Sequence, residues 1–96
     1  MDAYRTKRPG EERGFALDWP ELGPGETLAE DLGWLIVPQE LDAAALTLAG
    51  AALEAARTVA TLAGGRAGHL YHVSQRVRTS LGRTLSRAML VRVAEG

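Results

Sequence analysis

His69 and His72 are the two histidines of the chain, and imidazole is the side chain best suited to metal binding or proton transfer near neutral pH. On a helix, a separation of three residues would bring the two rings together, whereas on a β-strand an odd separation places them on opposite faces. The surrounding sequence LYHVSQRVRT alternates apolar and polar residues, which predicts a strand. We therefore expect two surface histidines and no metal site.

The other reactive side chains are not arranged for catalysis. Ser74, Ser80 and Ser86 do not lie in a nucleophile-elbow context, and the carboxylates cluster in turn-like segments without a paired histidine. The chain contains no cysteine, which excludes thiolate nucleophiles, thiolate zinc sites and disulfides. The glycines of LAGGRAG lack the lysine and serine of a phosphate-binding loop. The sequence predicts neither an enzyme nor a bound cofactor.

The charged residues are divided unevenly along the chain. From Glu11 to Glu54 every charged residue except Arg13 is acidic, whereas from Arg57 to Arg92 all seven are arginines. Either opposite charges lie side by side in one domain and neutralise each other, or they form separate faces that attract a second copy, nucleic acid or an acidic partner. The arginines have no exposed aromatic residues between them for base stacking, which favours a protein contact over nucleic acid.

The hydrophobic pattern indicates which elements hold these residues. The 96 residues allow one domain with a modest core, without a membrane span or the apolar segment of a signal peptide. Residues 1–14 are rich in charge, and we expect them to form a flexible N-terminal arm. Phe15, Leu17 and Trp19 then alternate with other residues, as in a short strand. We therefore expect a single domain at 15–96.

The last third of the chain predicts two long paired strands. One strand with a single buried face is indicated by the alternation of Tyr71, Val73, Gln75, Val77 and Thr79. A turn at 80–82 separates it from a second alternating segment at 88–93. A tyrosine at the start of such a strand is typical of immunoglobulin-like and fibronectin-like sandwiches, where its hydroxyl bonds to nearby backbone.

The segment LDAAALTLAGAALEAARTVATLAGG, residues 41–65, supports two interpretations. As a helix it has strong intrinsic propensity and an acceptable apolar stripe, with Gly50 as a weak point. As strands it alternates at 46–48 and again at 58–62, with a turn near 50–52. The composition alone favours the helix, so this segment decides between an all-β and a mixed fold.

Short motifs follow one another in a specific order over residues 14–94. They are Asp18-Trp19, Leu22-Gly23-Pro24-Gly25-Glu26-Thr27, Trp34 with Val37, Leu62-Ala63-Gly64-Gly65, Gly68, Tyr71-x-Val73, Arg76, Thr79-Ser80, Gly82-Arg83-Thr84 and Val91-x-Val93. In this order and spacing they resemble a family of small tailed-bacteriophage virion proteins, the phage fibre-tail adaptor proteins. The resemblance implies an all-β fold, with a single antiparallel immunoglobulin-like or fibronectin-like β-sandwich over 15–96. It also implies strands across 43–63, with a helical insertion over 41–57 as the alternative.

The resemblance further implies a structural, non-enzymatic adaptor that binds other virion proteins, such as tail, fibre or major capsid proteins. We expect multiple copies in a symmetric particle, assembled in the cytoplasm of the bacterial host, and no membrane partner. The alternatives are a decoration protein on the phage head and a nucleic-acid-binding module. The residues that we expect at protein interfaces are Tyr4, Arg5, Arg8, Arg13, Leu22, Glu26, Arg66, Arg76, Arg78 and Arg83.

Overall fold

Strands account for all the regular structure of the described residues. The computed structural model describes residues 3–95, and over that range it contains seven β-strands and no helix. They are β1 (Ala3–Lys7), β2 (Arg13–Asp18), β3 (Leu28–Val37), β4 (Thr47–Leu53), β5 (Arg57–Ala63), β6 (Leu70–Thr79) and β7 (Thr84–Val93). The alanine-rich segment therefore forms strands, and the all-β prediction is confirmed. Within the described residues no helix could cross a membrane.

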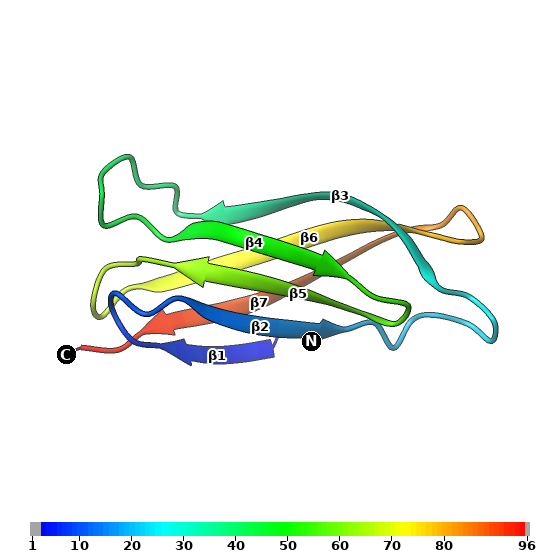
Figure 1. Cartoon of the computed structure of the whole chain (residues 1–96), viewed down its shortest axis with the longest axis horizontal. Coiled ribbons are helices and arrows are strands. Elements are labelled where there is room, and N and C mark those ends of the chain that lie inside the picture. Colours follow the sequence, from blue (N-terminus) through cyan, green and yellow to red (C-terminus); the bar gives the residue numbers. More distant parts are fainter. Residues whose placement is uncertain (1–2, 96) are drawn as a thin grey trace.

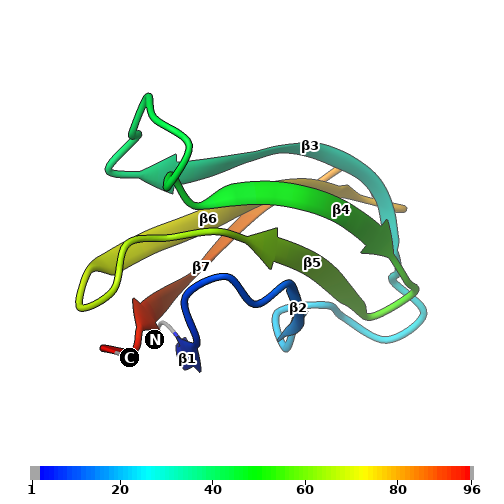
Figure 2. The same cartoon turned by 60° about the vertical axis from the view of Figure 1, so that its left-hand side comes forward.

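The seven strands form two sheets that pack face to face (Figures 1 and 2). The four-stranded sheet has the order β1-β7-β6-β3, and the three-stranded sheet has the order β2-β5-β4. This is the strand arrangement of an immunoglobulin-like sandwich, in which the second, fifth and fourth strands pair in one sheet. The sandwich prediction is confirmed, but the prediction that all strands are antiparallel is wrong at one pair, because β1 runs parallel to β7.

Strand β1 lies within the segment that the sequence predicts to be a flexible arm. Ala3–Lys7 pair with the end of β7, and β2 begins at Arg13, two residues earlier than expected. Lys7 is 1% exposed, and its Nζ donates hydrogen bonds to the carbonyl oxygens of Arg8 and Gly64 at 2.8 and 2.7 Å. Pattern reading misses this strand because a lysine stem fills its inner face. Residues 3–7, which the sequence predicts to be part of a flexible arm at residues 1–14, therefore belong to the four-stranded sheet.

The core lies between the two sheets, and both contribute to it. The inward residues of β6 are all buried, as the alternation predicts. The main cluster of buried apolar residues consists of Phe15, Leu17, Leu46, Ala60, Leu62, Tyr71, Val73, Met89, Val91 and Val93. A second cluster of Trp19, Leu28 and Val77 lies beside it. Together these clusters fix which face of each strand points outward.

The β4–β5 hairpin shows why alanine can stand in a strand here. Its turn lies at 54–56, and the pattern-based turn near 50–52 is wrong. Strand β4 is the edge of its sheet and is largely exposed, so few of its side chains need to fill core volume. Strand pairing with β5 therefore overrides the helix propensity of the segment.

Candidate protein-binding surfaces

The sandwich is an elongated body of 44 × 21 × 18 Å with loops gathered at its two ends (Figure 1). One end has the β2–β3, β4–β5 and β6–β7 connections, and the other has the β1–β2, β3–β4 and β5–β6 connections. At each end a carboxylate ties two of these connections together. Because the loops are fixed in this way, the surfaces near them are held in a defined shape.

At the first end, Glu26 connects the β2–β3 loop to the β6–β7 turn. Its carboxylate accepts two hydrogen bonds from Arg83, at 2.6 and 2.9 Å, one from the Thr79 hydroxyl at 2.6 Å and one from the Gly23 N–H at 2.9 Å. These bonds, chiefly those from Arg83, lower the pKa of Glu26 to about 2. The sequence predicts Glu26 at a protein interface, but its side chain is 1% exposed and is engaged inside the molecule.

Replacing Glu26 by glutamine should lower the stability at neutral pH and reduce its dependence on pH. The pKa of Glu26 is lower in the folded chain than in the unfolded one, so the ionised carboxylate stabilises the fold above its ordinary pKa, and this contribution disappears as the pH falls toward 2. The melting temperatures of wild type and Glu26→Gln should therefore converge between about pH 5 and pH 2. The exposed Glu12→Gln variant is the control. A constant gap between wild type and Glu26→Gln, measured by circular dichroism, would contradict this prediction.

At the other end, Tyr71 connects the β3–β4 and β5–β6 loops. Its hydroxyl accepts a hydrogen bond from the Arg66 N–H at 2.9 Å and donates one to Glu40 Oε1 at 2.6 Å. Arg66 Nε lies 3.4 Å from Glu40 Oε2, and Arg66 also pairs with Asp42. Burial raises the pKa of Tyr71, which keeps the hydroxyl protonated as a donor. The predicted bond from a corner tyrosine to nearby backbone is confirmed.

The acidic and basic halves of the sequence neutralise each other in the fold. The ion pairs between the halves are Glu21–Arg87, Glu26–Arg83, Glu30–Arg78 and Glu40–Arg66, and Glu54 pairs with Arg57. Five of the seven arginines from Arg57 to Arg92 are thus paired with carboxylates, as one of the two charge arrangements predicts. Within residues 3–95, Arg76 and Arg92 have no such partner.

The outward side of the four-stranded sheet bears a row of large side chains. The strand registers place Tyr4, Leu90, His72 and Val37 side by side across β1, β7, β6 and β3. The adjacent row contains Leu35 from β3, opposite Ser74. We define the outer face as Tyr4, Leu35, Val37, Leu70, His72, Leu90 and the flanking Arg76, Arg78 and Arg92. On this face Tyr4 is 55% exposed, Leu70 51%, Leu35 50% and Val37 46%.

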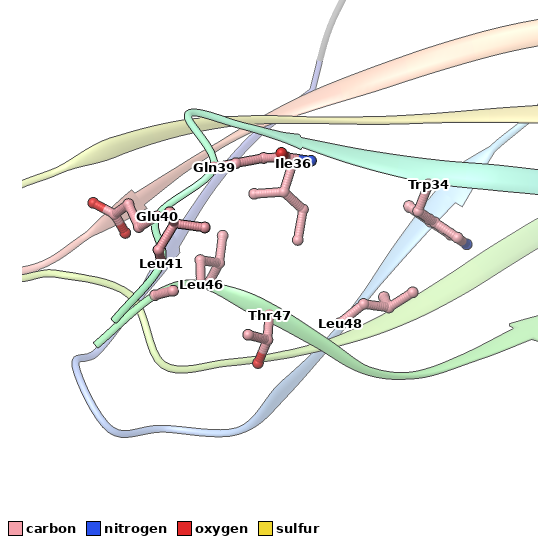
Figure 3. A pocket seen from close by; sticks show the side chains of 9 residues that line it. Trp34, Ile36, Gln39, Glu40, Leu41, Leu46, Thr47 and Leu48 are labelled. Atoms are coloured by element: carbon pink, nitrogen blue, oxygen red, sulfur yellow. The ribbon is translucent and has the colours of Figure 1, made fainter. Parts of the chain in front are cut away.

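A hollow opens on the side of the sandwich where the edges of β3 and β4 lie near each other (Figure 3). It has a volume of about 310 Å³ and is lined by Trp34, Ile36, Gln39, Glu40, Leu41, Ala45, Leu46, Thr47 and Leu48. Figure 3 shows Trp34 and Ile36 extending from β3 toward Leu46 and Leu48. Leu41, at the mouth of the hollow, is fully exposed. The lining is predominantly apolar, and this suits a protein contact better than a catalytic site.

Comparison with known families agrees with these features. The family model of the podophage GP4 fiber-tail adaptor protein gp77 matches residues 7–92 and so includes strands β2 to β6 and all but the last residue of β7. The chain belongs to this family of phage fiber-tail adaptors. No curated protein matches the chain.

As a member of this family, the adaptor is a structural, non-enzymatic component of the phage virion and belongs to the tail. It binds other virion proteins, as the resemblance implies. The family assignment to a fiber-tail adaptor replaces the alternative of a decoration protein on the phage head. The nucleic-acid alternative loses support, because five of the adaptor's ten arginines are paired with its own carboxylates.

The adaptor brings some of the predicted interface residues together and separates others. Tyr4, Arg76 and Arg78 lie on the outer face. Arg5 is partly buried, and its guanidinium lies 3.4 Å from the carbonyl oxygen of Ala16 in the other sheet. The residues in loops, turns or strand ends at the two ends of the body are Arg8, Arg13, Leu22, Glu26, Arg66 and Arg83.

Sequence reasoning misses Leu35, Val37 and Leu41 as surface residues. In WLIV, alternate residues are all apolar, so the run shows no polar face and resembles a strand buried on both sides. The strand order, which places β3 at the edge of its sheet, is needed to recognise this outward apolar face, and a contiguous exposed patch of this kind marks a binding surface. The adaptor thus presents two apolar surfaces, the outer face and the β3–β4 hollow.

Proposed function

We propose that this adaptor binds one of its partners, a tail or fibre protein, through the outer face, and that several copies do so around the tail. The observation that supports this proposal most directly is the row of Tyr4, Leu90, His72 and Val37, which crosses all four strands. Exposed apolar side chains gathered on one face of a sheet mark a protein-binding surface when they form a continuous patch.

The opposite side of the sandwich provides the contrast. The outward residues of the three-stranded sheet are mostly small, and its central rows pair Gly14 with Thr61 and Gly50, and Ala16 with Val59 and Ala52. Among residues 3–95, none of the exposed large apolar side chains lies on that outward face. A flat outward face rich in large apolar residues is therefore found on one of the two sheets and does not follow from the general composition of the chain.

The charges on the outer face indicate what kind of partner fits it. Arg76 and Arg92 flank this row and have no carboxylate partner within residues 3–95, while Arg78 is paired with Glu30 at 3.2 Å. A surface with an apolar centre and exposed arginines is complementary to a partner with an apolar centre and aspartate or glutamate at its edge. We infer that the partner surface has this composition.

The clusters of Glu26 and Tyr71 support an adaptor role in a different way. They fix loops at both ends of a 44 Å body, so a protein bound on one side is held at a defined distance and angle from a protein bound elsewhere. Several copies around a tail would also let individually weak contacts add up to a stable attachment. The proposed function therefore requires no conformational change.

The Leu35→Glu substitution tests the outer face. It places a charge in the apolar patch at a half-exposed position, so the fold should be kept while incorporation into particles falls at least about tenfold. Thr61→Glu, on the outward side of the other sheet, is the matched control and should be incorporated as wild type. Quantitative mass spectrometry of purified particles measures both incorporation and copy number. Wild-type incorporation of Leu35→Glu, or a single copy per particle, would contradict the proposal.

A further inference from the structure

Strand β4 differs from the other edge strands of the sandwich in having no charged residue. The edges β1, β2 and β3 contain Arg5 and Lys7, Arg13 and Asp18, and Glu30 and Asp31, respectively. Charged residues are a common means by which natural proteins keep an edge from pairing with another chain. Strand β4, with the sequence TLAGAAL, has neither charge nor proline over its seven residues.

The backbone of β4 is available for pairing. Its residues bond to β5 on one side, and no other backbone hydrogen bond involves residues 48–53. In an antiparallel edge strand, alternate residues direct N–H and C=O groups away from the sheet. One register shift, between Leu48 and Gly50, interrupts the strand near its start, whereas β3 contains two such shifts. Of the two edges on this side, β4 is therefore the more regular template.

The β3–β4 hollow lies next to this free edge. Leu48 belongs both to β4 and to the lining of the hollow, and it is 37% exposed. A strand added to β4 would therefore run past the hollow with alternate side chains directed toward it. The volume of about 310 Å³, with Trp34 and Ile36 on one wall, accommodates a large apolar side chain.

The charge on this side of the sandwich indicates which residues the added strand should have next to its large apolar side chain. Residues 28–56 contain five carboxylates and no lysine, arginine or histidine. Arg66 is shared by Glu40 and Asp42, and His69 Nδ1 lies 3.3 Å from Glu40 Oε2. Within residues 3–95, Asp31 accepts hydrogen bonds only from the Gly33 N–H and the Trp34 indole. This side is therefore net acidic even after its ion pairs are counted, which favours a segment with lysine or arginine.

We propose that the free edge of β4 accepts an extended segment of another virion protein as an added strand. A large apolar side chain of that segment fills the β3–β4 hollow, and basic residues on either side of it face the carboxylates. This inference rests on the proposed adaptor role and supplies the second binding surface that an adaptor needs. A second copy of the chain is the poorer occupant, because pairing β4 with β4 would bring two net acidic sides together.

Photo-cross-linking in intact particles tests where the segment binds. Benzoylphenylalanine at position 48 should form a cross-link to a tail or fibre protein, within a stretch of alternating apolar residues with lysine or arginine. The same group at Leu81, which is 70% exposed in the β6–β7 turn, is the control and should not reach that stretch. Amide hydrogen exchange of residues 48–53 should also slow at least about tenfold on assembly, because the added strand protects the N–H groups. Cross-links only to a second copy, or unchanged exchange in β4, would overturn the proposal.

Substitution of Leu41 tests the chemistry of the segment without disturbing the core, since this side chain is fully exposed. Leu41→Lys should reduce the yield of the position-48 cross-link more than Leu41→Glu, because a lysine repels a basic segment. Leu81→Lys is the control and should have no effect. The reverse order of the two Leu41 variants would show that the segment is not basic. Loss of incorporation by Leu35→Glu together with no cross-link at position 48 would leave the outer-face proposal intact and refute this one.

Discussion

Replacing Gly64 by alanine should lower the free energy of unfolding by roughly 3 kcal/mol. Gly64 has a φ of 75°, in the left-handed region that disfavours residues with a Cβ. A Cβ at this position would also overlap the carbonyl oxygen of Ala45 in the β3–β4 loop. Gly64 directly follows β5, and the atom that a Cβ would meet belongs to the backbone, so there is little room for relaxation. The cost of the left-handed backbone conformation and the cost of the overlap with Ala45 therefore apply at the same residue.

The surroundings of Gly64 increase the consequence of any shift. Its carbonyl oxygen accepts the hydrogen bond from Lys7 Nζ at 2.7 Å, and the N–H of the next residue, Gly65, bonds to the Ala44 carbonyl oxygen at 2.9 Å. Displacement of this backbone would weaken the hydrogen bond of the buried Lys7 and the contact between the β3–β4 and β5–β6 loops. Chemical denaturation measures the expected loss.

Gly25→Ala is the matched control for this prediction. Gly25 has nearly the same φ, 72°, but a Cβ there would meet no atom within 4 Å. The free energy of unfolding of Gly25→Ala should therefore fall only by the cost of the left-handed conformation, about 1–2 kcal/mol. Equal losses for the two variants would show that the backbone overlap at Gly64 has no energetic effect.

Strands that form most of the core are those that the sequence predicts best. In β6 and β7 every second residue faces the buried space between the sheets, so alternation of polar and apolar residues is imposed by packing. Strand β4 lies at an exposed edge, where packing imposes little, and its composition is free to resemble a helix. Strand β1 is defined by parallel pairing with the last strand of the chain, a contact that no local pattern can reveal.

The residues of the binding surfaces are likewise predictable only where packing imposes a local pattern. Arg76 and Arg78 were identifiable because they alternate with buried residues of β6. The sequence predicts Glu26 at an interface, because charge alone does not indicate whether a carboxylate is buried. Its partner, Arg83, lies 57 residues away, so no local pattern reveals the pairing. Leu35 and Val37 required the register of β3 against β6, which shows the face to which each residue belongs.

Replacing Tyr71 by phenylalanine should lower the free energy of unfolding by about 1–3 kcal/mol, since two partly buried hydrogen bonds would be lost. The variant keeps the ring, which is fully buried, and removes only the hydroxyl. The Arg66 N–H then loses its acceptor, and Glu40 Oε1 loses its donor. The effect should be concentrated at the end of the sandwich that contains these loops.

Tyr4→Phe is the control for Tyr71→Phe, because Tyr4 is 55% exposed and its hydroxyl makes no hydrogen bond within the described residues. Its stability should stay within about 0.5 kcal/mol of wild type. Hydrogen exchange in Tyr71→Phe should be faster at residues 40–46 and 64–69 than in wild type, with residues 19–27 unchanged. If exchange rose equally at both ends, the hydroxyl would stabilise the sandwich as a whole. Tyr71 would then not be the local connection between the β3–β4 and β5–β6 loops that its hydrogen bonds indicate.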